Sequence, residues 1–173
     1  MNTGLGPFYD GLAHLFVSPE DLLPVIALAL LAGLRGPRSG RAVLFVLPVA
    51  WLVGSLVGQW TAIAICPPIM NAVLILVLGA LVAADLAVPL PLLVTTAIAL
   101  GLLQGGANGA EFAGQHATGL TPAGIVVSIF VVTSLIAGQV TTIHAATPRI
   151  IVRVAGSWIA AIAMLTFGWS MRG

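Results

Sequence analysis

A long apolar region of the chain is interrupted by the polar, glycine-rich stretch Gly101-Leu-Leu-Gln-Gly-Gly-Ala-Asn-Gly-Ala-Glu-Phe-Ala-Gly-Gln-His116. Within it, Gln104, Asn108 and Glu111 recur at helical spacing, which places them on one side of an α-helix. An ionisable residue in a membrane helix is costly unless it faces a cavity or a partner. The stretch therefore predicts a buried helix whose polar side faces a functional site.

A stripe of small residues runs along the same predicted helix. Gly101, Gly105 and Gly109 occupy every fourth position. This small-xxx-small spacing lets a neighbouring helix approach almost to backbone contact in lipid. We therefore expect the helix to pack closely against a neighbour on one side and to face the site on the other.

The composition around this stretch is that of an integral membrane protein. The chain has 173 residues, of which 60% are hydrophobic and 6% charged, and it contains no lysine. A soluble domain carries about a quarter charged residues. The apolar runs approach the roughly 20 residues that a bilayer core requires, and they lack the alternation of a β-barrel. The sequence thus predicts an all-α, polytopic membrane protein that forms one domain over residues 1–173.

Turn signals divide the chain into a bundle of six predicted transmembrane helices. The expected spans cover about residues 21–34, 42–62, 68–84, 92–111, 121–145 and 147–171. Three of them open with a hydroxyl residue followed by proline, at Ser18-Pro19, Thr121-Pro122 and Thr147-Pro148, which is typical of a helix start. Residues 1–17 are too short and too polar to span, so we expect a short interfacial or re-entrant segment there.

Arginine placement predicts the orientation. In this topology five arginines share one side of the membrane and a sixth lies on the other: Arg35, Arg38, Arg41, Arg149 and Arg153, against Arg172. The positive-inside rule makes the arginine-rich side cytoplasmic. We therefore expect a multi-pass protein of the cell inner (plasma) membrane with both termini outside.

Further candidate ligands precede the first span and follow the fourth. His14 supplies an imidazole, and Glu20 and Asp21 supply carboxylates in the first helical turn. The helix dipole favours acids there with or without a ligand. His116 lies five residues beyond Glu111 and is a second candidate imidazole at the predicted outer face.

Other polar residues have two interpretations each. Glu111 either faces a cavity or lies just past the helix end among lipid headgroups. Asn71 in the third span either faces the same cavity or hydrogen-bonds a neighbouring helix. Asp85, at the inner end, is either an interfacial residue, or part of an exit path or a proton acceptor.

The fifth span carries a polar face formed by Ser128, Gln139 and Thr142. Such residues in a membrane helix are typical of interhelical hydrogen bonding.

Imidazole nitrogens together with carboxylate and amide oxygens, all at the predicted outer mouth of the bundle, suit a borderline or hard divalent cation. The predicted metal-binding residues are His14, Glu20, Asp21, Gln104, Asn108, Glu111 and His116. No Cys/His pair has the spacing of a structural zinc site, and no nucleophile–base pair is evident. We therefore expect a cation as substrate, no required cofactor, no nucleic-acid partner and no enzymatic activity.

Two short motifs resemble those of the HupE/UreJ family of small six-span membrane proteins. The family's first motif is a histidine, five residues, then Asp-His; here it reads His14-Leu-Phe-Val-Ser-Pro-Glu20-Asp21. The second is Phe-His-Gly-x-Ala-His-Gly-x-Glu; here it reads Leu103-Gln-Gly-Gly-Ala-Asn-Gly-Ala-Glu111. The glycines, the alanine and the closing glutamate match, and both histidines of the second motif are amides.

The resemblance implies a divergent branch of a family regarded as nickel or cobalt permeases. It implies a secondary permease that moves a divalent transition-metal cation across the bilayer. The alternative is a non-transporting membrane subunit or accessory protein, whose glycine and amide stripes bind a partner helix or a further copy of the chain.

Overall fold

A computed structural model of the chain describes residues 4–63, 68–113, 120–143 and 145–170. Within these ranges the regular secondary structure is all α-helix, as predicted. The helices are α1 (Pro7–Val17), α2 (Pro19–Leu34), α3 (Pro37–Thr61), α4 (Pro68–Ala83), α5 (Leu90–Phe112), α6 (Leu120–Thr141) and α7 (Ala146–Ser170). Each predicted span corresponds to one of α2–α7, although α6 ends at Thr141 rather than near Ala145.

The number of membrane crossings is smaller than the number of helices. Four helices, α3, α5, α6 and α7, are long and apolar enough to cross a bilayer. The pair α1 and α2 would provide a fifth span, but the two helices are bent by 73° at their junction. With 16 residues, α4 is shorter than the roughly 20 residues of a full span. The described part of the chain therefore gives four or five spans, and six are not confirmed.

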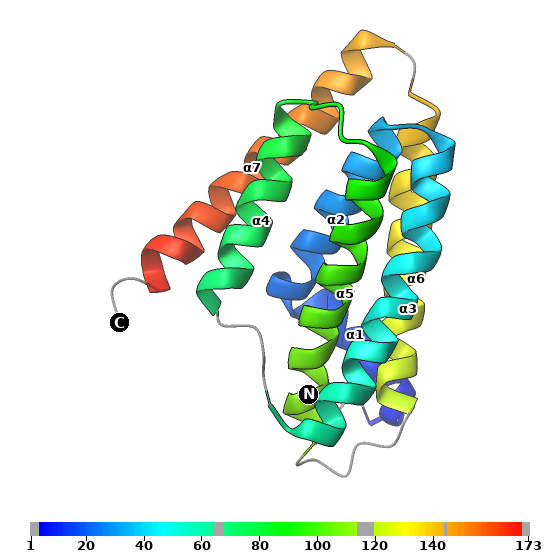
Figure 1. Ribbon diagram of the computed structural model, residues 1–173, viewed down its shortest axis with the longest axis vertical. Helices are drawn as coiled ribbons and strands as arrows, with labels where there is room; N and C mark the ends of the chain where they lie inside the picture. Colours follow the sequence, from blue (N-terminus) through cyan, green and yellow to red (C-terminus); the bar gives the residue numbers. More distant parts are fainter. Residues whose placement is uncertain (1–3, 64–67, 114–119, 144, 171–173) are drawn as a thin grey trace.

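Helix α2 lies at the centre of the molecule (Figure 1) and contacts each of the other helices. From Val25 to Gly33 it is apolar on all sides and all but Ile26 are buried. A helix that is hydrophobic all round belongs in a core. On one side of α2 lie α3, α5 and α6, and on the other α4 and α7 run side by side.

Helices α3 and α5 meet at backbone contact along the predicted glycine stripe. A Cβ atom at Gly105 would overlap the backbone oxygen of Trp51 in α3, and one at Gly109 would overlap that of Ser55. A Cβ at Gly101 would lie 2.8 Å from the backbone nitrogen of Trp51. The expectation of a close-packing face on this helix is confirmed.

Two other helix pairs also meet at backbone contact through glycine residues. A Cβ at Gly11 of α1 would overlap the backbone oxygen of Thr121 in α6. In the pair of α4 and α7, a Cβ at Gly79 would lie 2.7 Å from the backbone nitrogen of Ala160. The bundle is thus assembled from closely packed helix pairs around α2.

An ion-paired cluster closes the end of the bundle at which α2 ends and α7 begins (Figure 1). The carboxylate of Asp85, between α4 and α5, accepts hydrogen bonds from the guanidinium groups of Arg35 and Arg149, the latter through Nη2 at 2.9 Å. Arg153 donates from Nε to the carbonyl oxygen of Ala83 at 2.9 Å. Asp85 is therefore an ion-pair partner that ties the α4–α5 connection to α2 and α7.

The hydrogen bond from Arg149, together with the charge of both arginines, lowers the pKa of the Asp85 carboxyl below its ordinary value. The ion pairs of Asp85 therefore stabilise the folded state fully above the pKa of an unfolded aspartate, about 3.9. This stabilisation is lost as the pH falls through the lower pKa of Asp85 in the folded state.

We expect Asp85→Asn to lower the melting temperature of the detergent-solubilised protein at neutral pH. The residue has a φ of 52°, a left-handed conformation that asparagine tolerates as well as aspartate, so the change removes the charge without new backbone strain. The free energy of unfolding should fall by about 1–2 kcal/mol, between the values for exposed and buried ion pairs. The difference from wild type should shrink below about pH 4; a difference independent of pH would argue against an ionised Asp85.

Candidate functional site

The site is built around Asp21, in the first turn of α2. Ser18 is the N-cap residue and Pro19 the first residue of α2, as predicted, although the Ser18 side chain makes no capping hydrogen bond. The carbonyl oxygen of Ser18 accepts the backbone N–H groups of Asp21 and Leu22, both at 3.0 Å. This turn fixes the Asp21 side chain inside the bundle, where the residue is only 4% exposed.

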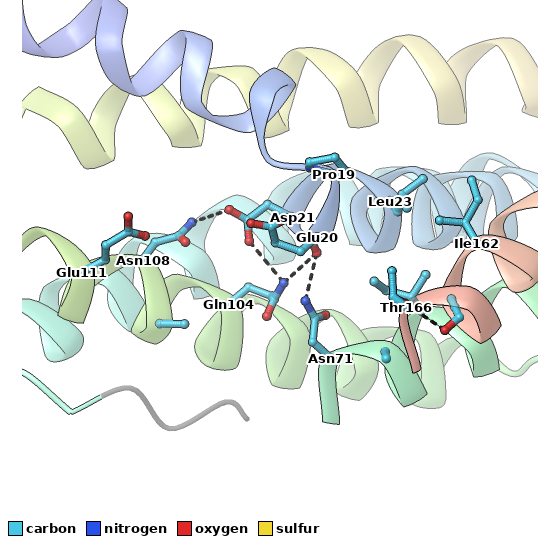
Figure 2. A pocket seen from close by; sticks show the side chains of 14 residues that line it. Pro19, Glu20, Asp21, Leu23, Asn71, Gln104, Asn108, Glu111, Ile162 and Thr166 are labelled. Carbon is cyan, nitrogen blue, oxygen red and sulfur yellow. Dashed lines mark hydrogen bonds between the residues drawn. The ribbon is translucent and has the colours of Figure 1, made fainter. Parts of the chain in front are cut away.

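The polar side of α5 meets Asp21 directly (Figure 2). Gln104 donates from Nε2 to Oδ1 of Asp21 at 3.2 Å, and Asn108 donates from Nδ2 to Oδ2 at 2.9 Å. Gln104 and Asn108 are themselves buried. The two amides, one helical turn apart, therefore hold one carboxylate between them, and each of its oxygens accepts an N–H group.

The 73° break between α1 and α2 brings His14 to the same carboxylate. Its Nε2 atom lies 3.5 Å from Oδ2 of Asp21. The imidazole also meets the ring of Phe112 at the end of α5 edge to face, with centroids 5.3 Å apart. His14 thus approaches Asp21 from α1 while the amides approach it from α5.

The predicted polar face of α6 anchors α1 through one residue. Ser128, which is buried, donates from Oγ to the carbonyl oxygen of Leu12 at 2.9 Å. Thr142 instead donates to the carbonyl oxygen of Gln139 in the same segment, at 2.7 Å. Ser128 is therefore the member of this face that forms an interhelical hydrogen bond and so helps to position His14.

The backbone of Glu20 joins three helices. Its carbonyl oxygen accepts a hydrogen bond from Nε2 of Gln104 at 3.0 Å and from Nδ2 of Asn71 at 3.2 Å. Asn71, in α4, therefore hydrogen-bonds a neighbouring helix, and it also lines the cavity described next. Both interpretations of this residue hold.

A cavity of about 530 Å³ opens beside these residues. Helices α2 and α5 form one wall, and α4 and α7 form the other (Figure 2). Its lining residues are Pro19, Glu20, Asp21, Leu23, Asn71, Ala72, Ile75, Gln104, Ala107, Asn108, Glu111, Ile162, Ala163 and Thr166. None of these described lining residues is basic, and three are acidic, so the cavity favours positive charge.

The structure brings together most of the residues predicted to form the site. Glu20, Asp21, Gln104, Asn108 and Glu111 line the cavity. His14 contacts Asp21 without lining the cavity, and His116 lies outside the described residues.

Within the described ranges, no three His, Cys, Asp or Glu side chains lie close enough together to hold a metal ion. The carboxylates therefore share a cavity without forming a compact ligand cluster.

Sequence reasoning missed the wall formed by α7. Thr166 and its neighbours Ile162 and Ala163 line the cavity, but α7 is apolar over most of its length and nothing in its sequence singles out these positions. Only the packing of α7 against α4 places them there.

Comparison with known proteins identifies the family of the chain. The model of the family described as HupE / UreJ protein matches residues 1–166, essentially the whole chain. No curated protein and no solved structure matches the chain. The segments that carry the two family-like motifs, from His14 to Asp21 and from Gln104 to Glu111, face each other across the site. This multi-pass helical membrane protein therefore belongs to the HupE/UreJ family.

Proposed function

We propose that the protein is a secondary permease for a divalent transition-metal cation such as nickel or cobalt. The observation that carries the proposal is a cavity inside a membrane bundle that is lined by Glu20, Asp21 and Glu111 and by no basic residue among those described. Acidic side chains in such a place are costly and mark cation pathways in membrane proteins. The HupE/UreJ family is one of nickel- or cobalt-associated accessory or transport membrane proteins and is not a known enzyme family.

The distribution of charge supports a path that starts at the acidic end. The cavity lies at the end of α2 that carries Glu20 and Asp21, whereas Arg35 and Arg149 surround Asp85 at the opposite end. A cation is attracted to the first end and repelled by the excess positive charge at the second, where two arginines share one carboxylate. By the positive-inside rule, the arginine end faces the cytoplasm of a cell with this protein in its inner membrane, and both termini face outward.

We expect Glu111→Gln to reduce nickel and cobalt uptake by about tenfold or more, because loss of one of three cavity carboxylates removes attraction equivalent to at least about 1.4 kcal/mol for a divalent ion. Uptake is measured by elemental analysis of washed cells and normalised to the amount of protein in the membrane. Glu111 is exposed at the mouth of the cavity, so the substitution should leave the bundle folded.

The matched control is Asp10→Asn, which makes the same chemical change in α1 outside the cavity lining. This variant should take up metal as the wild type does. Equal uptake by wild type and Glu111→Gln would remove Glu111 from the path. Absence of uptake by the wild type, with a membrane partner recovered in stoichiometric amount, would favour a non-transporting subunit instead.

A further inference from the structure

The central carboxylate of the site has both oxygens turned towards hydrogen-bond donors. Oδ1 of Asp21 accepts from Gln104 and Oδ2 from Asn108, and the imidazole Nε2 of His14 is 3.5 Å from Oδ2. Amide N–H groups are donors and carry partial positive charge. A bare cation bound directly to Asp21 would have to approach beside these N–H groups, and their partial positive charge opposes it.

The surrounding residues offer few direct ligands to replace the water of a divalent ion. Ions of this kind take about four to six ligands. In the described part of the chain, no group of three His, Cys, Asp or Glu side chains is compact enough to supply even half of that number. An ion stripped of its water would therefore depend largely on amide and main-chain oxygens, which suit nickel and cobalt less well than imidazole does.

The cavity is also much larger than a bare ion. Its volume is about 530 Å³, whereas an ion with about six waters occupies roughly 180 Å³ at about 30 Å³ for each water. The wall opposite Asp21 is largely apolar, with Ile75 from α4 and Ile162 from α7. Such a space suits a complex that carries its own ligands, including ligands with carbon atoms.

One acceptor in the lining has no partner among the residues that the structure describes. Nδ2 of Asn71 donates to the carbonyl oxygen of Glu20, but its Oδ1 atom is buried and makes no hydrogen bond to any described residue. A buried acceptor without a donor costs free energy. A metal-bound water or amine presents O–H or N–H groups outward and would satisfy Oδ1.

We infer that the cargo occupies this cavity as a cation that keeps its own shell of water or of a small chelator. Glu20 and Glu111 attract the complex by charge, and Asn71 accepts a hydrogen bond from the shell. Asp21, held by the two amides, contributes its charge without joining the coordination sphere. This inference rests on the proposed permease function and specifies the form in which the cation is recognised.

Hexaamminecobalt(III) tests the inference, because its six ammonia ligands exchange too slowly to be replaced by protein groups. The purified full-length protein in lipid nanodiscs is equilibrated with cobalt(II) chloride, and the inert complex is added as a competitor. We expect the complex to displace cobalt(II). Its dissociation constant should be at most about tenfold higher than that of cobalt(II) added as the chloride. Bound cobalt(II) should keep the weak visible absorption of the octahedral aqua ion.

Two variants refine this test. Asn71→Leu should weaken binding of hexaamminecobalt(III) about three- to tenfold, the effect of one hydrogen bond. Gln139→Leu replaces an exposed amide on α6 outside the cavity lining and should not alter binding. A second arm, used once hexaamminecobalt(III) is seen to compete, adds free histidine to nickel(II) chloride. Tighter nickel binding then identifies a chelated cargo, and weaker binding identifies the hydrated ion, because histidine withdraws the metal from the site.

The outcomes separate this inference from the function on which it rests. If cobalt(II) binds but hexaamminecobalt(III) fails to compete, or bound cobalt(II) acquires the intense absorption of a four-coordinate site, the protein ligates the metal directly. The inference is then wrong and the permease function stands. If neither species binds, both fail together.

Discussion

Gly105→Ala should prevent the protein from reaching its folded, monodisperse state. The added methyl group would overlap the backbone oxygen of Trp51, a completely buried residue of α3. A side chain can change rotamer to relieve such an overlap, but a backbone carbonyl in the middle of a helix cannot. The two helices would have to separate along the seam that also includes Gly101 and Gly109. We expect a cost at or above about 3 kcal/mol, the upper end of the usual range for overpacked cores.

The adjacent residue provides the control. A Cβ at Gly106 would lie 3.8 Å from the nearest atom, the backbone oxygen of Gly54, which is an ordinary contact distance. Gly106→Ala should therefore behave as the wild type in size-exclusion chromatography and thermal unfolding in detergent, whereas Gly105→Ala should aggregate or melt at a much lower temperature. Similar behaviour of the two variants would contradict the backbone contact between α3 and α5.

Asp21→Asn should reduce metal uptake almost to the level of cells that lack the protein, although the variant still folds. Gln104 also donates to the carbonyl oxygen of Glu20, so the new amide would keep its oxygen towards Gln104. Its NH₂ group would then face Asn108, which can turn its own amide over and accept. The hydrogen bonds survive as neutral ones, at a cost of about 1–2 kcal/mol, but the buried negative charge at the centre of the site is gone.

Uptake of nickel and cobalt is compared with that of Glu111→Gln and of the Asp10→Asn control at equal membrane abundance. We expect the loss to be greater for Asp21→Asn, because Asp21 is 4% exposed and its charge is screened less than that of Glu111 at the cavity mouth. Melting temperatures measured in parallel separate loss of transport from loss of folding. Near-normal uptake by a folded Asp21→Asn protein would place the cation path elsewhere.

The helices and the polar face of α5 could be predicted because local sequence rules govern them. Gln104 and Asn108 share a helical face whatever surrounds them, and proline at positions such as Pro19 marks a helix start. The glycine stripe predicted a close neighbour because only glycine permits backbone contact there. None of these inferences required knowledge of distant parts of the chain.

The rest of the site depends on tertiary packing that the sequence does not encode locally. Apolar membrane helices such as α4 and α7 present similar side chains on all sides, so their sequences do not indicate which side lines a cavity. Partners far apart in sequence, such as Asp85 with Arg35 and Arg149, are likewise set by the arrangement of whole helices. The six predicted spans are not confirmed, because α4 is helical but, at 16 residues, shorter than a full span.

The glycine contacts stiffen both sides of the cavity. The side that carries Gln104 and Asn108 is braced by main-chain contact of α5 with α3 at Gly105 and Gly109. The facing side is braced by contact of Gly79 in α4 with Ala160 in α7. Interlocked main chains have no rotamers through which to yield. Cargo of different widths would therefore be accommodated by a shift of one helix pair against the other, rather than by deformation within either pair.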